Sequence, residues 1–396
     1  MDMAGEEKKL TDREKELAAS FQAAKDNLRK CEKQVGMVMD LNKCIGCQLC
    51  SMACKTLWTN VEGREYMWWN KVNTMPGKGS PKDWEKMGGG YKVKFGGKVM
   101  EPILGKHPTR KEFGDMWKYN WNEVISNKAG EVHLQAKNPD GSNPDWAMNW
   151  DEDQGAGKYP NAFYFYLPRI CNHCAYPACL DACPRNAIYK RENDGAVLID
   201  QDRCKGYRFC LEACPYKVIY FNFVTDKSNK CIFCYPRLEQ KVPNACARQC
   251  TARVRWVGYV EDPKSIIYKL VKVWKVALPL HAEYGTNPNV FYIPPLAPPR
   301  LDAEGKLDTT KPRIPREYLR FLFGPEVDAA LGVMNTELEK VKSGGKSELM
   351  DILIARQWTH MFGPFDKDPA TLERKPAQPG SFSRNDLTAL NNEKNR

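Results

Sequence analysis

Cysteine spacing constrains this chain more than any other feature. Fifteen of its sixteen cysteines fall into four groups, which we number motifs I to IV in chain order. The motifs contain, in turn, Cys44, Cys47, Cys50 and Cys54; Cys171, Cys174, Cys179 and Cys183; Cys204, Cys210 and Cys214; and Cys231, Cys234, Cys246 and Cys250. Motif III has a tyrosine, Tyr207, where the C-x2-C-x2-C-x3-C pattern of motif I would have a cysteine. A proline follows the last cysteine of motifs II and III.

This spacing is typical of iron–sulfur proteins. In the bacterial C-x2-C-x2-C-x3-C-P run, three thiolates bind one cluster and the fourth cysteine binds the other cluster of a pair. Zinc sites also use C-x2-C pairs, but zinc needs four ligands from two pairs, which leaves the triplets and their fourth cysteine unexplained. Disulfide frameworks belong to small secreted chains, and this chain has 396 residues. Four motifs therefore predict four iron–sulfur clusters in two pairs.

The exchange of the fourth cysteine predicts the ligand sets. If motif I pairs with IV and motif II with III, the sets are Cys44, Cys47, Cys50 and Cys250; Cys231, Cys234, Cys246 and Cys54; Cys171, Cys174, Cys179 and Cys214; and Cys183, Cys204 and Cys210. The last cluster has no thiolate ligand at the position of Tyr207. A cubic [4Fe–4S] cluster readily loses the iron atom at a corner that no thiolate binds. We expect three [4Fe–4S] clusters and one [3Fe–4S] cluster, with the phenol filling the vacancy. The alternative is a water or hydroxide that completes a fourth [4Fe–4S] cluster.

Several stretches resemble one protein family over residues 36 to 300. They are MDLNKCIGC at 39–47, EYMWWN at 65–70, PRICNHC at 168–174, CKGYRFC at 204–210 and VFYIPP at 290–295. These are similar to the iron–sulfur β subunits of the DMSO-reductase-type molybdenum enzymes. The branch is that of nitrate reductase, nitrite oxidoreductase, ethylbenzene and dimethylsulfide dehydrogenases, and selenate and (per)chlorate reductases. Motifs I and IV are followed by Lys55 and Thr251 rather than proline, which does not disturb ligation.

The resemblance implies an electron-transfer subunit. A catalytic α subunit would hold molybdenum bis-molybdopterin guanine dinucleotide, and a γ subunit or membrane anchor would hold haem b. Electrons would cross the motif I/IV pair and then the motif II/III pair, ending at the three-iron cluster. No acid–base pair or nucleophile emerges from the sequence, so we expect no substrate chemistry in this chain.

Other kinds of protein remain as alternatives. They are a free-standing polyferredoxin, the β subunit of a formate-dehydrogenase-like complex, and a zinc-stapled scaffold. Formate dehydrogenase and DMSO reductase β subunits keep four cysteines in every motif, so Tyr207 argues against them.

Charge and hydropathy bear on partners and location. The formal net charge is +11, but four clusters of about two negative charges each would lower it to roughly +3. A nucleic-acid role is therefore not expected. The apolar stretch at 271–280 is too short for a membrane span, and the charged N-terminus lacks a secretory signal. We expect export to the periplasm with a signal-bearing partner, because residues 73–79 and 84–90 resemble exported members; the alternative is the cytoplasmic face of the membrane.

The fold expected is α+β, with two ferredoxin-like modules related by a pseudo-twofold axis. Module A combines 37–60 with 228–260, and module B is 165–227. Residues 1–36 form a helical extension, 61–164 an insertion, 261–362 a docking region and 363–396 a flexible tail. Strands are expected at 196–200 and 218–223, short helices after Cys179 and Cys210, and further helices at 266–277, 315–323 and 337–357.

The sequence also predicts the roles of several residues that are not cluster ligands. A capping box at Thr11 and Glu14 begins the N-terminal helix, whose apolar stripe contains Leu17 and Phe21. Cys31 ends that stripe as a small apolar residue. His173 is expected beside a cluster or in packing rather than as a ligand. Seven basic residues beside the cysteines are expected to be either solvated or to raise cluster potentials: Lys43, Lys55, Arg185, Lys205, Arg208, Lys217 and Lys230.

Overall fold

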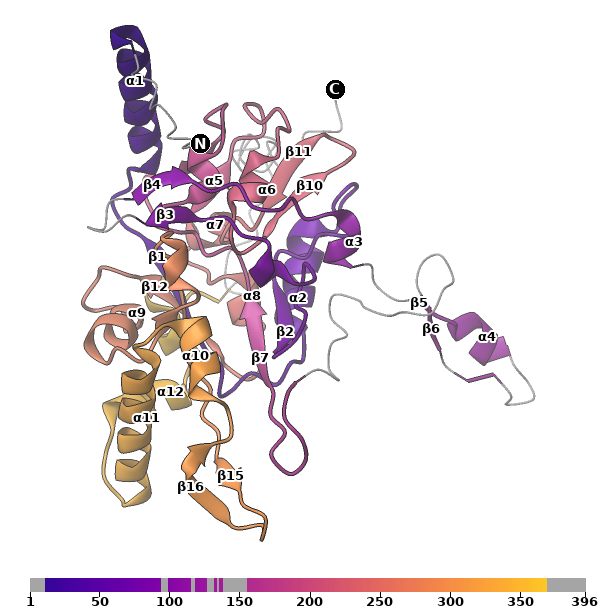
Figure 1. The fold of residues 1–396 in the computed structure, drawn as a ribbon, viewed down its shortest axis with the longest axis vertical. Helices are drawn as coiled ribbons and strands as arrows, with labels where there is room; N and C mark the ends of the chain where they lie inside the picture. The colour runs from indigo at the N-terminus through magenta and orange to yellow at the C-terminus, as the bar shows by residue number, and fades with distance from the viewer. Residues whose placement is uncertain are drawn as a thin grey trace, which may run out of the picture.

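A computed structural model describes residues 11–93, 99–114, 118–126, 132–133, 135–137 and 155–368 (Figure 1). Its elements are mixed helix and sheet, as expected for an α+β protein. One mixed four-stranded sheet and several two-stranded sheets provide the strands, and the helices are mostly short. One large cluster of buried apolar side chains includes residues of all four cysteine motifs. The motifs are therefore part of the core.

The four-stranded sheet brings motifs I and IV together. Its strand order is β12 (Arg255–Tyr259), β1 (Val35–Asp40), β14 (Val290–Ile293) and β13 (Leu278–Pro279). Strand β1 runs antiparallel to β12 and parallel to β14, and it is buried along its whole length. Such burial suits the nearly continuous apolar sequence of β1. Because the end of β1 pairs with the start of β12, Cys44 just after β1 lies near Cys250 just before β12.

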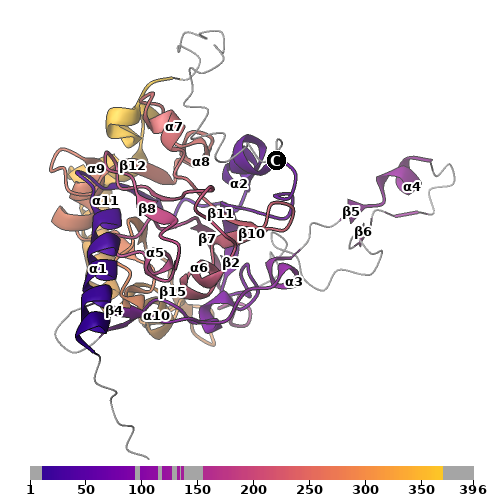
Figure 2. The same ribbon diagram turned by 90° about the horizontal axis from the view of Figure 1, so that it is seen from above.

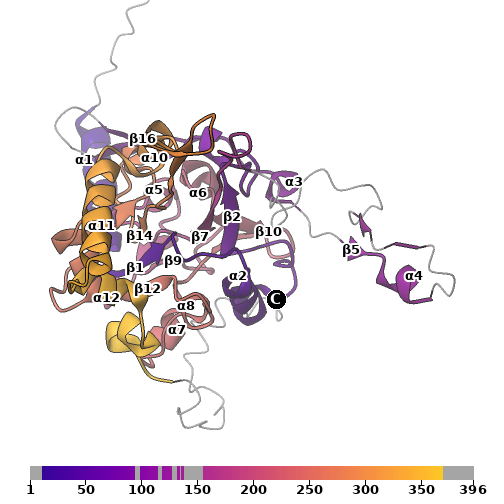
Figure 3. The ribbon, with the colours of Figure 1, turned by 90° about the horizontal axis from the view of Figure 1, so that it is seen from below.

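Helices α2 and α8 complete the surroundings of motifs I and IV. Helix α2 (Leu49–Cys54) carries Cys50 and Cys54 and continues into a π-helical turn, Lys55–Thr59. It packs against α8 (Ala245–Arg248), which carries Cys246, and both lie on the same side of the molecule as α7 (Tyr235–Leu238) in Figure 3. The local backbone thus brings the end of motif I to motif IV.

Motifs II and III are carried by another pair of helices, with two hairpins beside them. Helices α5 (Ala178–Asp181) and α6 (Phe209–Ala213) pack together and are neighbours in Figure 2. Two hairpins accompany them: β8 (Ile188–Lys190) with β9 (Val197–Ile199), and β10 (Ile219–Asn222) with β11 (Lys227–Lys230). Strands β9 and β10 lie within the two stretches predicted as strands, and α5 and α6 occur at the predicted helices.

The segment between motifs I and II contributes strands and turns around these helices. Strand β2 (Lys71–Met75) pairs with β7 (Phe165–Arg169). The backbone N–H of Gly90 donates to Ala213 O at 2.9 Å, and that of Gly105 donates to Glu212 O at 3.1 Å. This part of the segment therefore lies on the end of α6. Its other elements are the 3-10 turn Trp84–Lys86, β3 (Tyr91–Val93), β4 (Val99–Pro102), α3 (Arg110–Phe113), β5 (Lys118–Tyr119), α4 (Trp121–Ser126) and β6 (Ala136–Lys137).

Helix α1 (Asp12–Arg29) begins with the predicted capping box, in which Thr11 and Glu14 bond reciprocally. Leu17 and Phe21 are 62% and 47% exposed, so the first part of the predicted apolar stripe does not lie on this chain's core. Lys25 is instead buried, at 2% exposure. The helix projects from the main body in Figure 1.

The C-terminal part is mainly helical. Helix α9 (Ile266–Tyr268) runs into a π-helical turn, Lys269–Val273, and α10 (Arg316–Phe323) occurs where a helix was predicted. The prediction of a single helix at 337–357 is wrong, because α11 (Val327–Lys342) and α12 (Glu348–Ile354) are separate helices. Gly344, with φ of 87°, and Gly345 interrupt the helix between them. The remaining elements are β15 (Pro299–Leu301), β16 (Leu307–Pro312) and 3-10 turns at Ala282–Tyr284, Trp358–Met361 and Gly363–Phe365.

Residues 369–396 of the predicted flexible tail lie outside the described residues. Within the part of the chain that is described, no helix is long and apolar enough to cross a membrane.

Candidate metal centres

Motifs I and IV bring their cysteines together in two groups. Cys44 interacts electrostatically with Cys50 and Cys250, and the Cys47 sulfur lies 3.9 Å from Oγ1 of Thr251, the residue after Cys250. Cys54 interacts with three cysteines of motif IV: Cys231, Cys234 and Cys246. The last cysteine of motif I therefore lies among the cysteines of motif IV, and Cys250 lies among those of motif I.

Motifs II and III line two cavities. One is lined by four cysteines, Cys171, Cys174, Cys179 and Cys214. The other is lined by Cys183, Cys204, Tyr207 and Cys210. The fourth cysteine of each motif again contributes to the group of the other motif. Among the described residues, no three His, Cys, Asp or Glu side chains converge closely enough to hold a single metal ion; these cysteines surround a space instead.

Tyr207 stands at the rim of the second cavity. Its side chain is 59% exposed, so the phenol borders the space without filling it. The backbone turns sharply on either side, with φ of 69° at Gly206 and 67° at Arg208. The Arg208 guanidinium lies 3.8 Å from the centre of the Phe221 ring, which fixes the loop that carries Tyr207.

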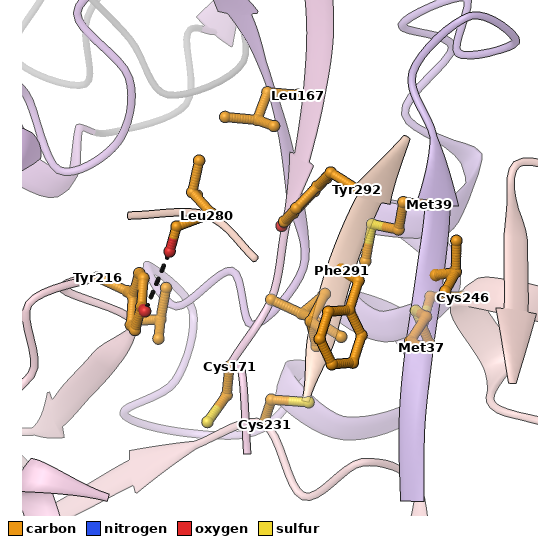
Figure 4. Packing of buried hydrophobic residues seen from close by; sticks show 14 of the residues in the cluster. Met37, Met39, Leu167, Cys171, Tyr216, Cys231, Cys246, Leu280, Phe291 and Tyr292 are labelled. Atoms are coloured by element: carbon orange, nitrogen blue, oxygen red, sulfur yellow. Dashed lines mark hydrogen bonds between the residues drawn. The ribbon is translucent and has the colours of Figure 1, made fainter. Parts of the chain in front are cut away.

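The four groups of cysteines are adjacent in a fixed order. Cys50 interacts with Cys246 across the first two groups. Cys231 interacts with Cys171 across the second and third groups, and these two side chains lie side by side in Figure 4. Cys210 of the fourth group interacts with Cys214 of the third group. The groups thus form a continuous series from motif I to motif III.

Hydrogen-bond donors point at the cysteine sulfurs. Backbone N–H groups of Val254, Phe233 and Ala187 lie 3.3 Å, 3.4 Å and 3.4 Å from the sulfurs of Cys250, Cys231 and Cys183. The Trp58 indole N–H donates to Cys234 at 3.2 Å. Donors of this kind stabilise thiolates and tune iron–sulfur clusters. The surroundings of the cysteines therefore fit thiolate ligands.

Buried cations accompany the cysteines. Nη2 of Arg255 lies 3.3 Å from the Cys50 sulfur and 2.8 Å from Asn70 Oδ1. Nζ of Lys230 lies 3.6 Å from the Cys171 sulfur. Of the seven basic residues noted in the sequence, Lys217 and Lys230 are buried, whereas Arg185 and Lys205 are exposed. Arg255 was missed, because nothing in the sequence near it indicates that its side chain reaches a cysteine 205 positions away.

Burial opposes charge on these thiols. It raises the pKa of Cys44, Cys174, Cys210 and Cys246 to about 12. Such thiols would stay neutral near pH 7 unless a cationic centre stabilises the thiolate. Bound iron is such a centre, so the burial of the cysteines is compatible with clusters and unfavourable for free thiolates.

Comparison with known proteins agrees with this geometry. Residues 162–260, which contain motifs II, III and IV, match the family described as "4Fe-4S dicluster domain". The chain is 54% identical to the respiratory nitrate reductase subunit beta of Haloferax mediterranei over 328 residues, 81% of this chain and 91% of that protein. It is 51% identical to the dimethylsulfide dehydrogenase subunit beta of Rhodovulum sulfidophilum, over 84% of this chain and 98% of that protein. The selenate reductase subunit beta of Thauera selenatis is 53% identical over 82% of this chain and 96% of its own length.

Identity at this level over most of both chains shows a common family. The chain belongs to the iron–sulfur β subunits of the molybdenum enzymes, in the branch that includes nitrate, selenate and chlorate reductases and dimethylsulfide dehydrogenase. Its function is electron transfer within such a complex, as the resemblance implied.

Proposed function

We propose that the chain carries three [4Fe–4S] clusters and one [3Fe–4S] cluster. The proposed ligand sets are Cys44, Cys47, Cys50 and Cys250; Cys54, Cys231, Cys234 and Cys246; Cys171, Cys174, Cys179 and Cys214; and Cys183, Cys204 and Cys210. The proximity of cysteines within each set supports them. The observation that carries the proposal is the exchange of the fourth cysteine within each pair of motifs, since this exchange is the rule in two-cluster ferredoxins.

Tyr207 supports a three-iron cluster in the last set. Its exposed phenol leaves the fourth corner of the cavity without a thiolate. An oxygen ligand from solvent at that corner would instead complete a fourth [4Fe–4S] cluster. The three-iron form is favoured because iron at such a corner is bound by a weak, exchangeable ligand.

The series of cysteine groups forms the path for electrons. It runs from the Cys44 set to the Cys54 set, then to the Cys171 set and the Cys183 set. When bound, the clusters supply the redox chemistry, and the protein's part is to hold them in sequence and to exclude water. The direction of flow depends on the catalytic partner, outward for a dehydrogenase or nitrite oxidase and inward for a reductase.

Each end of the path has an exposed apolar surface. At the motif I end, Ile45, Leu49 and Met52 are exposed beside the exposed Cys47. At the other end, Tyr207 and Phe209 are exposed. Exposed apolar groups around a redox centre suit stable subunit interfaces. We assign the first surface to a catalytic α subunit with the molybdopterin cofactor, and the second to a haem b γ subunit or membrane anchor.

The location that we propose is the periplasm, reached by export together with a signal-bearing partner subunit. The support is the likeness of residues 73–79 and 84–90 to exported members of the family. Protease accessibility in spheroplasts tests this location, since protection of the chain until the inner membrane is lysed would place it at the cytoplasmic face instead.

A break in the middle of the path tests the electron-transfer route. Cys231→Ser removes a ligand at the junction of the two cluster pairs. In the purified complex, we expect substrate-side electrons to reach the Cys44 cluster but no longer to change the redox state of the three-iron cluster, as followed by rapid-freeze EPR. Turnover with a small dye that accepts electrons directly from the catalytic subunit should persist. Unchanged transfer to the three-iron cluster in a variant proven to lack the Cys231 cluster would contradict the route.

A further inference from the structure

His173 lies inside motif II, directly before Cys174, and its side chain is completely buried. Its Nδ1 atom accepts a hydrogen bond from the backbone N–H of Val197 at 2.9 Å. A ring nitrogen that accepts a hydrogen bond carries no proton, so the imidazole is neutral and its proton is on Nε2. The structure thereby fixes the tautomer of His173.

The Nε2–H group of His173 lacks a partner. No atom of the described residues accepts a hydrogen bond from it, although it is buried. Buried N–H groups are nearly always paired in folded proteins, and an exception calls for an acceptor that belongs to another molecule or group. His173 lines the same cavity as Cys171, Cys174, Cys179 and Cys214. The group that occupies this cavity is therefore the candidate acceptor.

We propose that the Nε2–H of His173 donates a hydrogen bond to a sulfur atom of the [4Fe–4S] cluster in this cavity and raises the midpoint potential of that cluster. The inference rests on the ligand set proposed above. Hydrogen bonds to cluster sulfurs stabilise the reduced form, because reduction adds negative charge that the donor partly offsets. His173 is then a tuning residue and not an iron ligand.

The ring is held rigidly in place for this role. The His173 backbone has φ of 41°, and its carbonyl accepts from Asn289 Nδ2 at 2.9 Å. Its ring meets the Phe233 ring edge to face at 4.9 Å between centres. The carbonyl of Val197, whose N–H anchors Nδ1, accepts from Lys230 Nζ. A donor fixed from several sides avoids reorganisation when the cluster changes charge.

His173 also stands where the two cluster pairs meet. The N–H of its neighbour Phe233 lies 3.4 Å from the Cys231 sulfur, and Cys231 lies beside Cys171. A change in the potential of the Cys171 cluster would therefore alter the step between the Cys54 and Cys171 sets. We infer that His173 helps to set the driving force of this step.

The first test looks for the hydrogen bond directly in the wild-type complex, with His173→Phe as its control. The complex is produced with histidine labelled with ¹⁵N only in the imidazole ring, and pulsed EPR (HYSCORE) is recorded at potentials where the Cys171 cluster is reduced. We expect a weak ¹⁵N coupling from a hydrogen-bonded Nε2, and the same coupling should vanish in His173→Phe. Absence of any ring ¹⁵N coupling to that cluster would overturn the proposal.

The second test measures the potential. In EPR-monitored redox titrations, His173→Phe should lower the midpoint potential of the Cys171 cluster and leave the other three unchanged. His173→Gln, whose amide can both accept from Val197 and donate to the cluster, should restore most of the potential. His360→Gln, at an exposed histidine, is the matched control. An unchanged potential in His173→Phe would overturn the inference.

Iron content separates failure of this inference from failure of the proposed ligand set. If the wild-type complex lacks a [4Fe–4S] cluster at Cys171, Cys174, Cys179 and Cys214, the ligand set itself is wrong. If the cluster is present in full amount in wild type and in His173→Phe, and neither coupling nor potential depends on His173, only the inference fails.

Discussion

At the scale of single residues, the proposed type of the terminal cluster depends on Tyr207. The other three sets offer four sulfurs each, and the fourth set offers three sulfurs and an exposed phenol. The Tyr207 main chain already follows the loop geometry of the motif, between Gly206 and Arg208 with positive φ. A cysteine at this position should therefore direct its sulfur toward the open corner.

The variant Tyr207→Cys tests this interpretation. We expect a fourth [4Fe–4S] cluster, so that the three-iron EPR signal of the oxidised complex disappears and iron rises by about one atom per chain. Tyr159→Cys, at a highly exposed tyrosine outside the motifs, serves as the control for an added thiol. A three-iron signal of unchanged amplitude in Tyr207→Cys would count against the assigned corner.

Candidate ligands could be proposed from the sequence, whereas the residues that surround them could not. Cysteine spacing is local, and the exchange of the fourth cysteine is a property of the motif. Arg255 and His173 act through contacts with distant parts of the chain: Arg255 reaches Cys50, and His173 is anchored by Val197. A sequence shows that such residues exist but not which groups their side chains contact. Arg255 was therefore missed, and His173 was expected near a cluster only because it lies inside motif II.

At the scale of elements, helix α1 is attached to motif II by polar contacts. Nζ of Lys25 donates to Leu180 O at 2.8 Å and to Cys183 O at 2.5 Å. Arg29 pairs with Asp181, which also accepts from the Tyr91 hydroxyl. Burial is the main cause that lowers the pKa of Lys25. The helix thus supplies a cation to the end of α5, directly beside a predicted ligand of the three-iron cluster.

Removing this cation should loosen the terminal cluster. Lys25→Met removes the ammonium donor from the carbonyls of Leu180 and Cys183, each of which keeps a backbone N–H donor. The cost is therefore that of the two hydrogen bonds to a charged donor, about 1.5–3 kcal/mol each. We expect the three-iron signal to be lost faster on mild heating, while the signals of the other clusters decay at the wild-type rate. Lys30→Met, at an exposed lysine near the end of the same helix, should behave as wild type. Equal decay in Lys25→Met and wild type would show that the contact is dispensable.

Short elements were predicted well where their sequence pattern was local. Strands β9 and β10 are short apolar runs that lie between turns close to the cysteines. Helix α10 has a strongly apolar face and ends at Gly324. The prediction of one helix at 337–357 was wrong because it followed an apolar periodicity that continues through residues 343–347. Two glycines in that stretch disfavour helix. The apolar stripe of α1 is divided, since Leu28 packs against the core whereas Leu17 and Phe21 are exposed. The sequence left open whether this stripe contacts the core or a partner.

At the scale of the whole molecule, the sheet and helix pairs hold the four cysteine motifs in the order that the proposed electron path requires. Strand β1 connects α1 with motif I, and its neighbours β12 and β14 come from far along the chain. Such long-range pairing keeps the cysteine sets at fixed separations. The two exposed ends of the path are then free to contact different partner subunits.

The proposed interface with the catalytic subunit at the motif I end can be tested by introducing charged side chains. Leu49→Glu with Met52→Glu places two carboxylates on the exposed face of α2. Burying unpaired charges in an interface is strongly unfavourable, so we expect the catalytic subunit to be lost on co-purification while the iron content of this chain is retained. Leu307→Glu, on the distant β16 strand, is the control. Full co-purification of the double variant would place the catalytic subunit elsewhere.

The most direct test of the central claim is EPR of the natively purified, air-oxidised complex, with iron quantified per chain. Three [4Fe–4S] clusters and one [3Fe–4S] cluster predict the sharp signal of an oxidised three-iron centre, together with about fifteen irons in this subunit. About sixteen irons and no such signal would contradict the account, because they would show that the corner at Tyr207 holds iron without a thiolate.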